Sequence, residues 1–284
     1  MAARWSAPAK LNLYLHVVGR RADGYHLLDS LVAFAAPADE ITAEPASALS
    51  LALRGPYAAA LGNAPRDNLV WRAAERLAAA CARPPAAALT LTKNLPVASG
   101  IGGGSSDAAA ALKALAALWR LEPGAVDLAA IAQTLGADVP VCLAARAAWL
   151  GGTGEAVEPA SGLPPVTALL VNPGIALSTP AVFEARQGAF SAPARFAMPT
   201  DAAALAALLA VRRNDLSDAA IALVPAIGHV LERLASLEGA LIARMSGSGA
   251  TCFALFAVPE AASAAAARLS VERSGWWVAA GRLS

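Results

Sequence analysis

Lysine, cysteine and long hydrophobic runs are all scarce in this chain of 284 residues. Only Lys10, Lys93 and Lys113 are lysines among the 22 basic residues, and 21 acidic residues bring the formal net charge to +1. No block of Lys and Arg stands out, which argues against nucleic-acid binding, because such binding needs a basic face. Alanine supplies 77 residues of the 57 % hydrophobic fraction, and no stretch of about 18 strongly apolar residues occurs. We expect neither a nucleic-acid partner nor a membrane partner.

The three cysteines, Cys81, Cys142 and Cys252, are far apart and have apolar neighbours. No Cys-x-x-Cys or Cys/His spacing indicates a zinc site, so we expect reduced thiols in a protein core. Residues 1–8 lack the apolar segment of a signal peptide. Both features favour a cytoplasmic location.

A strict alternation of residue types over residues 10–17 predicts a strand. The apolar positions are Leu11, Leu13, Leu15 and Val17, and the polar positions are Lys10, Asn12, Tyr14 and His16. A turn signal at Asp23-Gly24 and a second strand over 26–34 complete a predicted hairpin. Taken alone, the polar positions are typical of a solvated sheet face.

A glycine-rich segment over residues 95–106 separates a predicted strand (89–93) from a predicted helix. We expect Ser105 or Ser106 to be the N-cap of this helix, with Asp107 in its first turn. Unpaired N–H groups at a helix N-terminus favour phosphate binding. The segment is not a Walker A motif, because no lysine follows Gly104. It is not a credible dinucleotide fingerprint either, because Pro96 interrupts the preceding strand.

Two further segments have the composition of functional loops. Asp138 follows a predicted helix (125–135) and precedes Pro140, so it is a turn aspartate, a proton acceptor or a metal ligand. Residues 246–251 form a second glycine-rich turn, which suits either an anion-binding nest or a tight hairpin.

Glycine and proline cluster between residues 151 and 165, which predicts a boundary there and domains of 1–158 and 159–284. Helices are predicted over 67–82, 201–211, 214–222, 225–238 and 259–269, and strands over 166–172, 240–245, 251–258 and 276–280. Because helices and strands mix without strict βαβ repetition, the fold class is predicted to be α+β.

Taken together, five segments resemble the GHMP kinase superfamily. They are residues 8–13, 20–26, 96–106, 136–140 and 246–251. Segments 23–26 and 136–140 are similar to the members that act on a cytidine diphosphate methylerythritol. The resemblance implies a ribosomal-protein-S5-like N-terminal ATP-binding domain and a ferredoxin-like C-terminal domain. It also implies transfer of the γ-phosphoryl group of ATP to the 2-hydroxyl of that substrate, a step of the non-mevalonate route to isoprenoid precursors.

The resemblance also implies roles for individual residues. Asp138 matches the catalytic base and substrate contact, Lys10 matches the catalytic lysine, and Ser106 is a Mg²⁺ ligand by analogy. The other substrate contacts are Asn12, Tyr25, His26, Thr179 and Phe183, and Asn68 and Lys93 match nucleotide contacts. The implied phosphate loop comprises Pro96, Val97, Ala98, Ser99, Gly100, Ile101, Gly102, Gly103, Gly104, Ser105 and Ser106. Ser99 and Ile101 depart from the glycine and leucine usual in the family.

Two other interpretations stay open at this point. One is another kinase of the superfamily, acting on homoserine, mevalonate or a sugar. A pyrimidine pocket built from Tyr25, His26 and Phe183 distinguishes our prediction from that one. The other is a nucleotide-binding protein without catalysis, which has no use for the combination of Lys10 and Asp138.

Overall fold

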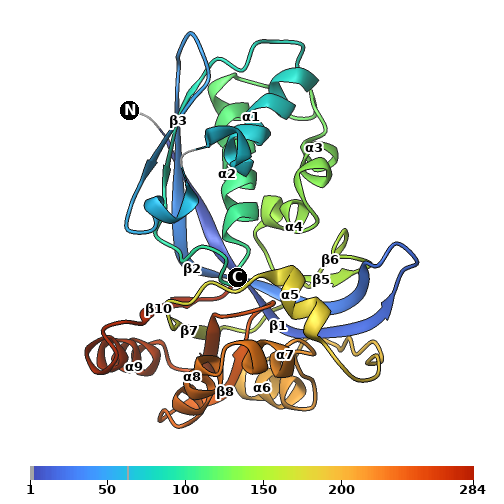
Figure 1. Cartoon of the computed structure of the whole chain (residues 1–284), viewed down its shortest axis with the longest axis vertical. Coiled ribbons are helices and arrows are strands. Elements are labelled where there is room, and N and C mark those ends of the chain that lie inside the picture. Colours follow the sequence, from blue (N-terminus) through green and yellow to red (C-terminus); the bar gives the residue numbers. More distant parts are fainter. Residues whose placement is uncertain (1–2, 63) are drawn as a thin grey trace. The chain divides into compact units, whose positions relative to one another are not determined.

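The chain folds into two compact units that interleave along the sequence (Figure 1). The computed structural model describes residues 3–62 and 64–284. The first unit comprises the chain up to Ala9, Ala38–Val97 and Gly102–Ala145, and the second comprises Lys10–Pro37, Ala98–Ile101 and Arg146–Ser284. The glycine-rich segment is thus divided between them. The domain boundary predicted between residues 158 and 159 stays a prediction.

The two longest strands, β1 (Arg4–Arg20) and β2 (His26–Glu44), contribute to both units. In the first unit the end of β2 pairs antiparallel with β4 (Ala88–Thr92), which pairs in parallel with β3 (Ser50–Arg54). A parallel pair needs a crossover connection, and here it contains the 3₁₀ helices Ala58–Leu61 and Pro65–Asp67 and helix α1 (Leu69–Ala80). The strand predicted over 89–93 is confirmed as β4.

Helix α2 (Gly103–Leu118) is the central helix of the first unit and packs on α1, α3 (Leu128–Leu135) and α4 (Val139–Ala144). Its alanines favour the helix and allow close approach on several sides. The predicted N-cap is wrong: Gly102 is the N-cap, in a left-handed conformation with φ +62°. Ser105 and Ser106 therefore lie inside the first turn, and Asp107 lies in the second turn.

The second unit contains an antiparallel sheet of order β10-β7-β9-β8 (Figure 1). Its central strands, β7 (Thr167–Asn172) and β9 (Cys252–Phe256), are buried along their whole length. The edge strands are β8 (Ala240–Met245) and β10 (Trp277–Arg282). The short strands β5 (Ala148–Gly151) and β6 (Ala156–Pro159), not predicted from the sequence, extend the first half of β2.

Five helices complete the second unit. They are α5 (Thr179–Ala185), α6 (Ala202–Ala210), α7 (Ser217–Leu223), α8 (Ala226–Ala235) and α9 (Pro259–Glu272). Helices α6, α8 and α9 pack on the four-stranded sheet. The predicted helices and strands of this part of the chain are confirmed, with shifts of a few residues at their ends. Within residues 3–62 and 64–284, no helix has the length and hydropathy needed to cross a bilayer.

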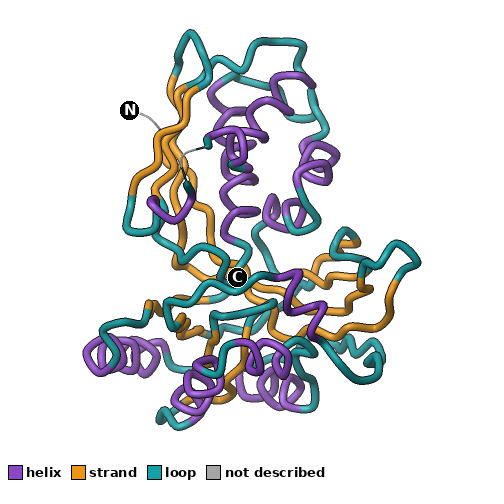
Figure 2. The backbone as a smooth tube through the Cα atoms, in the orientation of Figure 1, coloured by secondary structure: helices purple, strands orange, loops and turns teal. Residues whose placement is uncertain are grey.

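The polar positions of β1 are buried, so their interpretation as a solvated face is wrong. Lys10, Asn12, Tyr14 and His16 are all less than 9 % exposed. A long stretch that carries neither helix nor strand, residues 186–200, covers part of this face (Figure 2). His16 Nδ1 lies 3.0 Å from Ala192 O, and Asp29 Oδ2 accepts the Tyr14 hydroxyl at 2.8 Å and the Ala194 N–H at 2.7 Å.

The two glycine-rich segments meet in the second unit. Ser246 Oγ donates to Gly100 O at 2.9 Å, and Thr251 N donates to Ser99 O at 3.0 Å. A Cβ on Gly100 would lie 2.5 Å from Ser246 O and 2.7 Å from Gly249 N. Since φ at Gly100 is +76°, both space and backbone conformation require glycine there.

We predict that Gly100→Ala is much more destabilising than Gly188→Ala. Gly188 also has a positive φ, of +91°, but a Cβ there has no described atom within 4 Å. Gly188→Ala should lower the unfolding free energy by about 1 kcal/mol through the backbone alone. Gly100→Ala should lower it by about 3 kcal/mol or more, because main-chain atoms must move. Urea unfolding measures both, and equal losses would contradict the close approach.

Candidate functional site

Lys10 and Asn12 bring strand β1 to the two glycine-rich segments in the second unit. The Lys10 N–H donates to Ile101 O at 2.9 Å, and the Asn12 N–H donates to Ser246 Oγ at 3.1 Å. The Asn12 amide donates to Ser30 Oγ at 2.8 Å, while Asn12 Oδ1 is buried with no hydrogen-bond partner among the described residues. An unsatisfied buried acceptor is costly, so this oxygen is suited to a donor supplied by a ligand.

Thr179 lies against the second glycine-rich segment. Its Oγ1 is 2.7 Å from Ser248 Oγ, and the nearby Leu177 N–H donates to Ala98 O at 3.2 Å. Strands β8 and β9 pair antiparallel up to Met245 and Cys252. Residues 246–251 are therefore the turn of a hairpin that also carries hydroxyl groups to the first glycine-rich segment.

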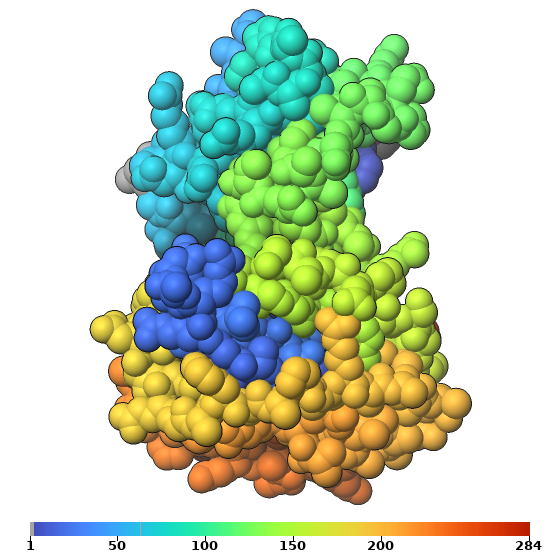
Figure 3. Space-filling view, turned by 90° about the vertical axis from the view of Figure 1, so that its right-hand side faces the viewer, coloured from blue at the N-terminus to red at the C-terminus, as the bar shows by residue number. Residues whose placement is uncertain are grey.

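Two of the three predicted pyrimidine contacts touch each other. The rings of His26 and Phe183 are stacked, with centroids 5.0 Å apart and planes at 22°. Tyr25 is 66 % exposed. The hairpin that carries Tyr25 and His26 lies at the surface beside the segment that follows α5 (Figure 3). Burial, followed by the guanidinium groups of Arg20 and Arg186, lowers the pKa of His26, so its ring is neutral at neutral pH.

The rest of the predicted phosphate loop belongs to the first unit. The N–H groups of Gly103, Gly104 and Ser105 at the start of α2 have no acceptors inside the helix, whereas the Ser106 N–H donates to Gly102 O at 2.9 Å. Gly104 is exposed there, whereas Ser106 is 2 % exposed and donates through Oγ to Pro8 O at 2.7 Å. In the second unit, Ala98 is left-handed at φ +49° although it is not glycine, and such strain clusters at functional sites.

Asn68 and Asp138 both stand at helix starts in the first unit. Asn68 Oδ1 accepts the Val70 N–H at 2.9 Å and so caps α1. Asp138 is the N-cap residue of α4 and is half-buried. Pro140 follows at the start of α4 and favours the helix, so the local sequence fixes the backbone that carries Asp138.

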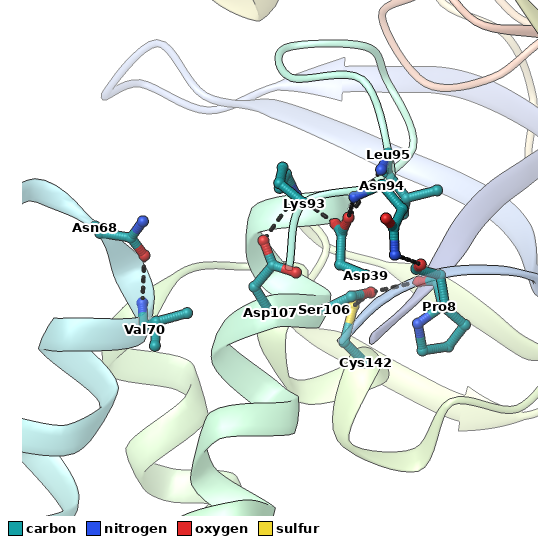
Figure 4. Close-up of polar contacts among 11 residues, drawn as sticks. Pro8, Asp39, Asn68, Val70, Lys93, Asn94, Leu95, Ser106, Asp107 and Cys142 are labelled. Atoms are coloured by element: carbon teal, nitrogen blue, oxygen red, sulfur yellow. Dashed lines mark hydrogen bonds and ion pairs between the residues drawn. The ribbon is translucent and has the colours of Figure 1, made fainter. Parts of the chain in front are cut away.

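A buried ionic cluster of Asp39, Lys93 and Asp107 lies at the base of α2 (Figure 4). The Lys93 ammonium is ion-paired with Asp39 and, at 2.7 Å, with Asp107. All three residues are at most 2 % exposed. Burial alone would lower the pKa of Lys93, but the carboxylates of Asp107 and Asp39 raise it. Burial raises the pKa of Asp107 to about 7, Lys93 opposes this rise and Asp39 adds to it.

The family resemblance implied Lys93 only as a nucleotide contact, and sequence reasoning missed Asp39 and Asp107 as its partners. Asp107 was expected only as a first-turn acid, and Asp39 stands in a strand without a motif. The scarcity of lysine was the signal that could have found them, because a buried lysine needs carboxylates. Among the described residues, no group of three His, Cys, Asp or Glu side chains could hold a metal ion.

We predict that Asp107 makes the stability of the protein fall as the pH rises from about 4 to about 7. Its folded pKa of about 7 exceeds the ordinary aspartate pKa of 3.8. The folded state therefore holds a proton that the unfolded state releases, and this preference is lost above the folded pKa. Thermal unfolding of Asp107→Asn should lack this slope. If the variant and the parent have the same pH dependence between pH 5 and 7, Asp107 does not titrate as described.

Comparison with known proteins places the chain in a family. It matches the model of the GHMP kinases N terminal domain over residues 68–146 and that of the GHMP kinases C terminal over residues 197–273. A 4-diphosphocytidyl-2-C-methyl-D-erythritol kinase of Cereibacter sphaeroides (strain KD131) is 54 % identical, with 98 % of each chain covered. One of Paramagnetospirillum magneticum is 52 % identical, with 98 % of this chain and 97 % of that protein covered.

Solved structures agree. The structure is similar to a crystal structure of 4-(cytidine 5'-diphospho)-2C-methyl-D-erythritol kinase, with a TM-score of 0.80, 39 % identity and 99 % of both chains covered. Homoserine kinase from Cytophaga hutchinsonii has a TM-score of 0.67 at 16 % identity, with 99 % of this chain and 94 % of that chain covered, and so shares the fold. The expected two-domain GHMP kinase fold is confirmed. The chain therefore belongs to the GHMP kinases and, within them, to the 4-diphosphocytidyl-2-C-methyl-D-erythritol kinase family.

Proposed function

We propose that this chain transfers the γ-phosphoryl group of ATP to the 2-hydroxyl of 4-diphosphocytidyl-2-C-methyl-D-erythritol. The similarity of 52–54 % over nearly the whole chain to kinases of that name carries this proposal. The meeting of Lys10, Asn12 and both glycine-rich segments in the second unit supports it. A cytoplasmic location stays a prediction, supported by the three free cysteines.

In the proposed reaction Asp138 accepts the proton of the substrate hydroxyl. The hydroxyl oxygen then forms a bond to the γ-phosphorus, and the bond from that phosphorus to the β–γ bridging oxygen breaks, which releases ADP. The Lys10 ammonium is assigned to offset negative charge near the acceptor oxygen. Positioning and charge neutralisation of this kind dominate a loose phosphoryl-transfer transition state.

ATP phosphates are assigned to residues 96–106, where a helix N-terminus offers backbone N–H groups to an anion. The exposure of Gly104 at the start of α2 supports this assignment. Asn68 and Lys93 are assigned to the nucleotide side. Asn68 is half-buried at the start of α1, and Lys93 is 2 % exposed, so Lys93 would act on the nucleotide from beneath α2.

We propose that Mg²⁺ binds together with ATP rather than at a site formed by protein side chains. Ser106, the predicted ligand, already donates its hydroxyl to Pro8 O and lies 3.4 Å from Cys142 Sγ. The described residues contain no carboxylate cluster for a metal. Mg²⁺ in kinases is bound largely through substrate phosphates and water, and no step of our mechanism is routed through a protein-bound metal.

The cytidine ring is assigned to the His26–Phe183 stack, with Tyr25 beside it. A neutral imidazole and a phenyl ring provide flat apolar faces for a base, and base–aromatic stacking contributes about 1–3 kcal/mol per base. Asn12 Oδ1 is assigned as an acceptor for a substrate donor, because it is buried without a partner among the described residues. Thr179, an exposed residue whose Oγ1 lies 2.7 Å from Ser248 Oγ, is assigned to the same substrate.

ADP release with a panel of acceptors tests the proposal. We expect ADP with 4-diphosphocytidyl-2-C-methyl-D-erythritol, and none above background with homoserine, mevalonate, galactose or no acceptor. Release with another alcohol only would retain the kinase fold and contradict the substrate. If ATP binds but no acceptor yields ADP, the chain is a nucleotide-binding protein without catalysis.

We predict that Asp138→Asn lowers kcat at least about 100-fold, since a general base contributes at least that factor. The ATP dissociation constant, measured by calorimetry, should change less than about threefold, because the substitution preserves shape. Asp127→Asn is the matched control: Asp127 caps the neighbouring helix α3 through its carboxylate, and asparagine caps equally well. A normal kcat in Asp138→Asn would contradict the assignment of the base.

We predict that Phe183→Leu raises the KM for the cytidylyl substrate about tenfold, which corresponds to the loss of one stacking contact. The KM for ATP should not change. Phe190→Leu is the control, because Phe190 lies in the same part of the chain but is 51 % exposed. Equal effects of the two substitutions would remove Phe183 from the substrate pocket.

A further inference from the structure

The glycine-rich segment enters and leaves the first unit at the same buried cluster. Asp39 Oδ1 accepts the N–H groups of Asn94 and Leu95, at 2.6 and 2.8 Å. These two residues immediately precede Pro96, where the predicted phosphate loop begins. One carboxylate oxygen in β2 thus holds the entry to the loop.

The other oxygen of Asp39 leads to the exit from the loop. Asp39 Oδ2 is paired with the Lys93 ammonium, which also contacts Asp107 Oδ2 at 2.7 Å in the second turn of α2. Gly103, the first residue of α2, lies directly over this ammonium, because a Cβ on Gly103 would be 3.1 Å from Lys93 Nζ. Figure 4 shows Lys93 between the two aspartates, with the backbone of residues 94 and 95 at Asp39.

The backbone of Lys93 is fixed as firmly as its side chain. Its N–H donates to Arg54 O at 2.7 Å, and its carbonyl accepts the Tyr57 N–H at 3.2 Å. A Cβ on Gly55 would lie 2.6 Å from that carbonyl oxygen. The end of strand β3 and the residues that follow it therefore fix the backbone from which the lysine side chain starts.

Burying three charged side chains costs free energy, so a contribution to stability does not by itself explain why the cluster is present. Buried ion pairs are often no more stabilising than apolar residues of similar size. Here two carboxylates share one ammonium, and Asp107 Oδ1 has no hydrogen-bond partner among the described residues. The directed bonds to Asn94, Leu95 and the second turn of α2 provide what an apolar cluster cannot, namely a fixed distance between the two ends of the loop.

We propose that Asp39, Lys93 and Asp107 are positioning residues that hold the two ends of the glycine-rich loop in register and thereby set the affinity for the phosphates of ATP. This inference rests on the proposed function, because it assigns that loop to ATP. The cluster does not touch the acceptor in this account. Its loss therefore changes ATP binding selectively.

Steady-state kinetics of Asp39→Asn test the inference, with the parent protein measured first. Asparagine keeps the size of Asp39 but places a neutral amide beside the ammonium. We expect the KM for ATP to rise about tenfold, which corresponds to about 1.4 kcal/mol, while the KM for the cytidylyl acceptor stays within about twofold of the parent. Measurements are made where circular dichroism shows folded protein, so that global unfolding does not contribute.

Asp215→Asn is the matched control. Asp215 is also a buried carboxylate that accepts a backbone N–H, from Val17 at 2.7 Å, and pairs with an arginine, Arg213, at 2.6 Å. It belongs to the second unit and has no assigned role in binding. We expect Asp215→Asn to lower the melting temperature but to leave both KM values unchanged. A rise in the KM for ATP as large as in Asp39→Asn would show a general effect of destabilisation and overturn the inference.

Asp107→Asn decides the matter if Asp39→Asn does not fold, because it leaves the bonds from Asp39 to Asn94 and Leu95 in place. A selective rise in the KM for ATP supports the positioning role. An unchanged KM for ATP, or equal changes in both KM values, overturns it.

A parent protein that transfers no phosphoryl group to the cytidylyl substrate contradicts the proposed function instead. In that case calorimetric titration of ATP onto the parent and the variants tests the cluster separately, and equal dissociation constants overturn the inference.

Discussion

The approach of the backbone at Gly100 to residues 246–249 is the constraint on which the candidate site depends. Main-chain atoms lie where any side chain would begin, so the first glycine-rich segment adopts one position against the second. Hydrogen bonds from Lys10 N to Ile101 O and from Asn12 N to Ser246 Oγ then fix β1 to both segments. Backbone contacts of this kind place functional side chains more reliably than the flexible side chains themselves can.

In the first unit, charged side chains rather than backbone contacts hold the glycine-rich residues in place. Its central helix, α2, is built from alanines, which bury little area each and give few directional contacts. The cluster of Asp39, Lys93 and Asp107 provides directional contacts, which those alanines do not. It fixes the start of α2 at the residues that we assign to ATP, and it explains why Lys93, one of the chain's three lysines, is buried.

Much of the fold could be predicted from the sequence, because local patterns determine it. Alternation over residues 10–17 indicated the strand, and glycine and serine residues indicated the turn over 246–251. The burial of Tyr14 and His16 could not be predicted, because the covering segment lies more than 170 residues later in the chain. The N-cap at Gly102 was missed because a left-handed glycine replaced the expected serine.

The candidate site was predictable where its residues belong to motifs and not where they join distant segments. Lys10, Asn12 and Thr179 do lie at the glycine-rich segments of the second unit, and His26 does meet Phe183. Asp39 belongs to no sequence motif. The other two residues of its cluster, Lys93 and Asp107, lie 54 and 68 positions further along the chain. Only the fold shows that it holds both ends of the loop.

The position of the phosphoryl group in the product decides whether this chain phosphorylates the 2-hydroxyl of the cytidylyl substrate. The product formed from ATP and 4-diphosphocytidyl-2-C-methyl-D-erythritol is examined by phosphorus and carbon nuclear magnetic resonance. We predict one new phosphomonoester signal, with phosphorus coupling at the tertiary carbon that carries the 2-hydroxyl. A phosphate on another hydroxyl, or ADP and inorganic phosphate with no phosphomonoester, would contradict the proposed reaction.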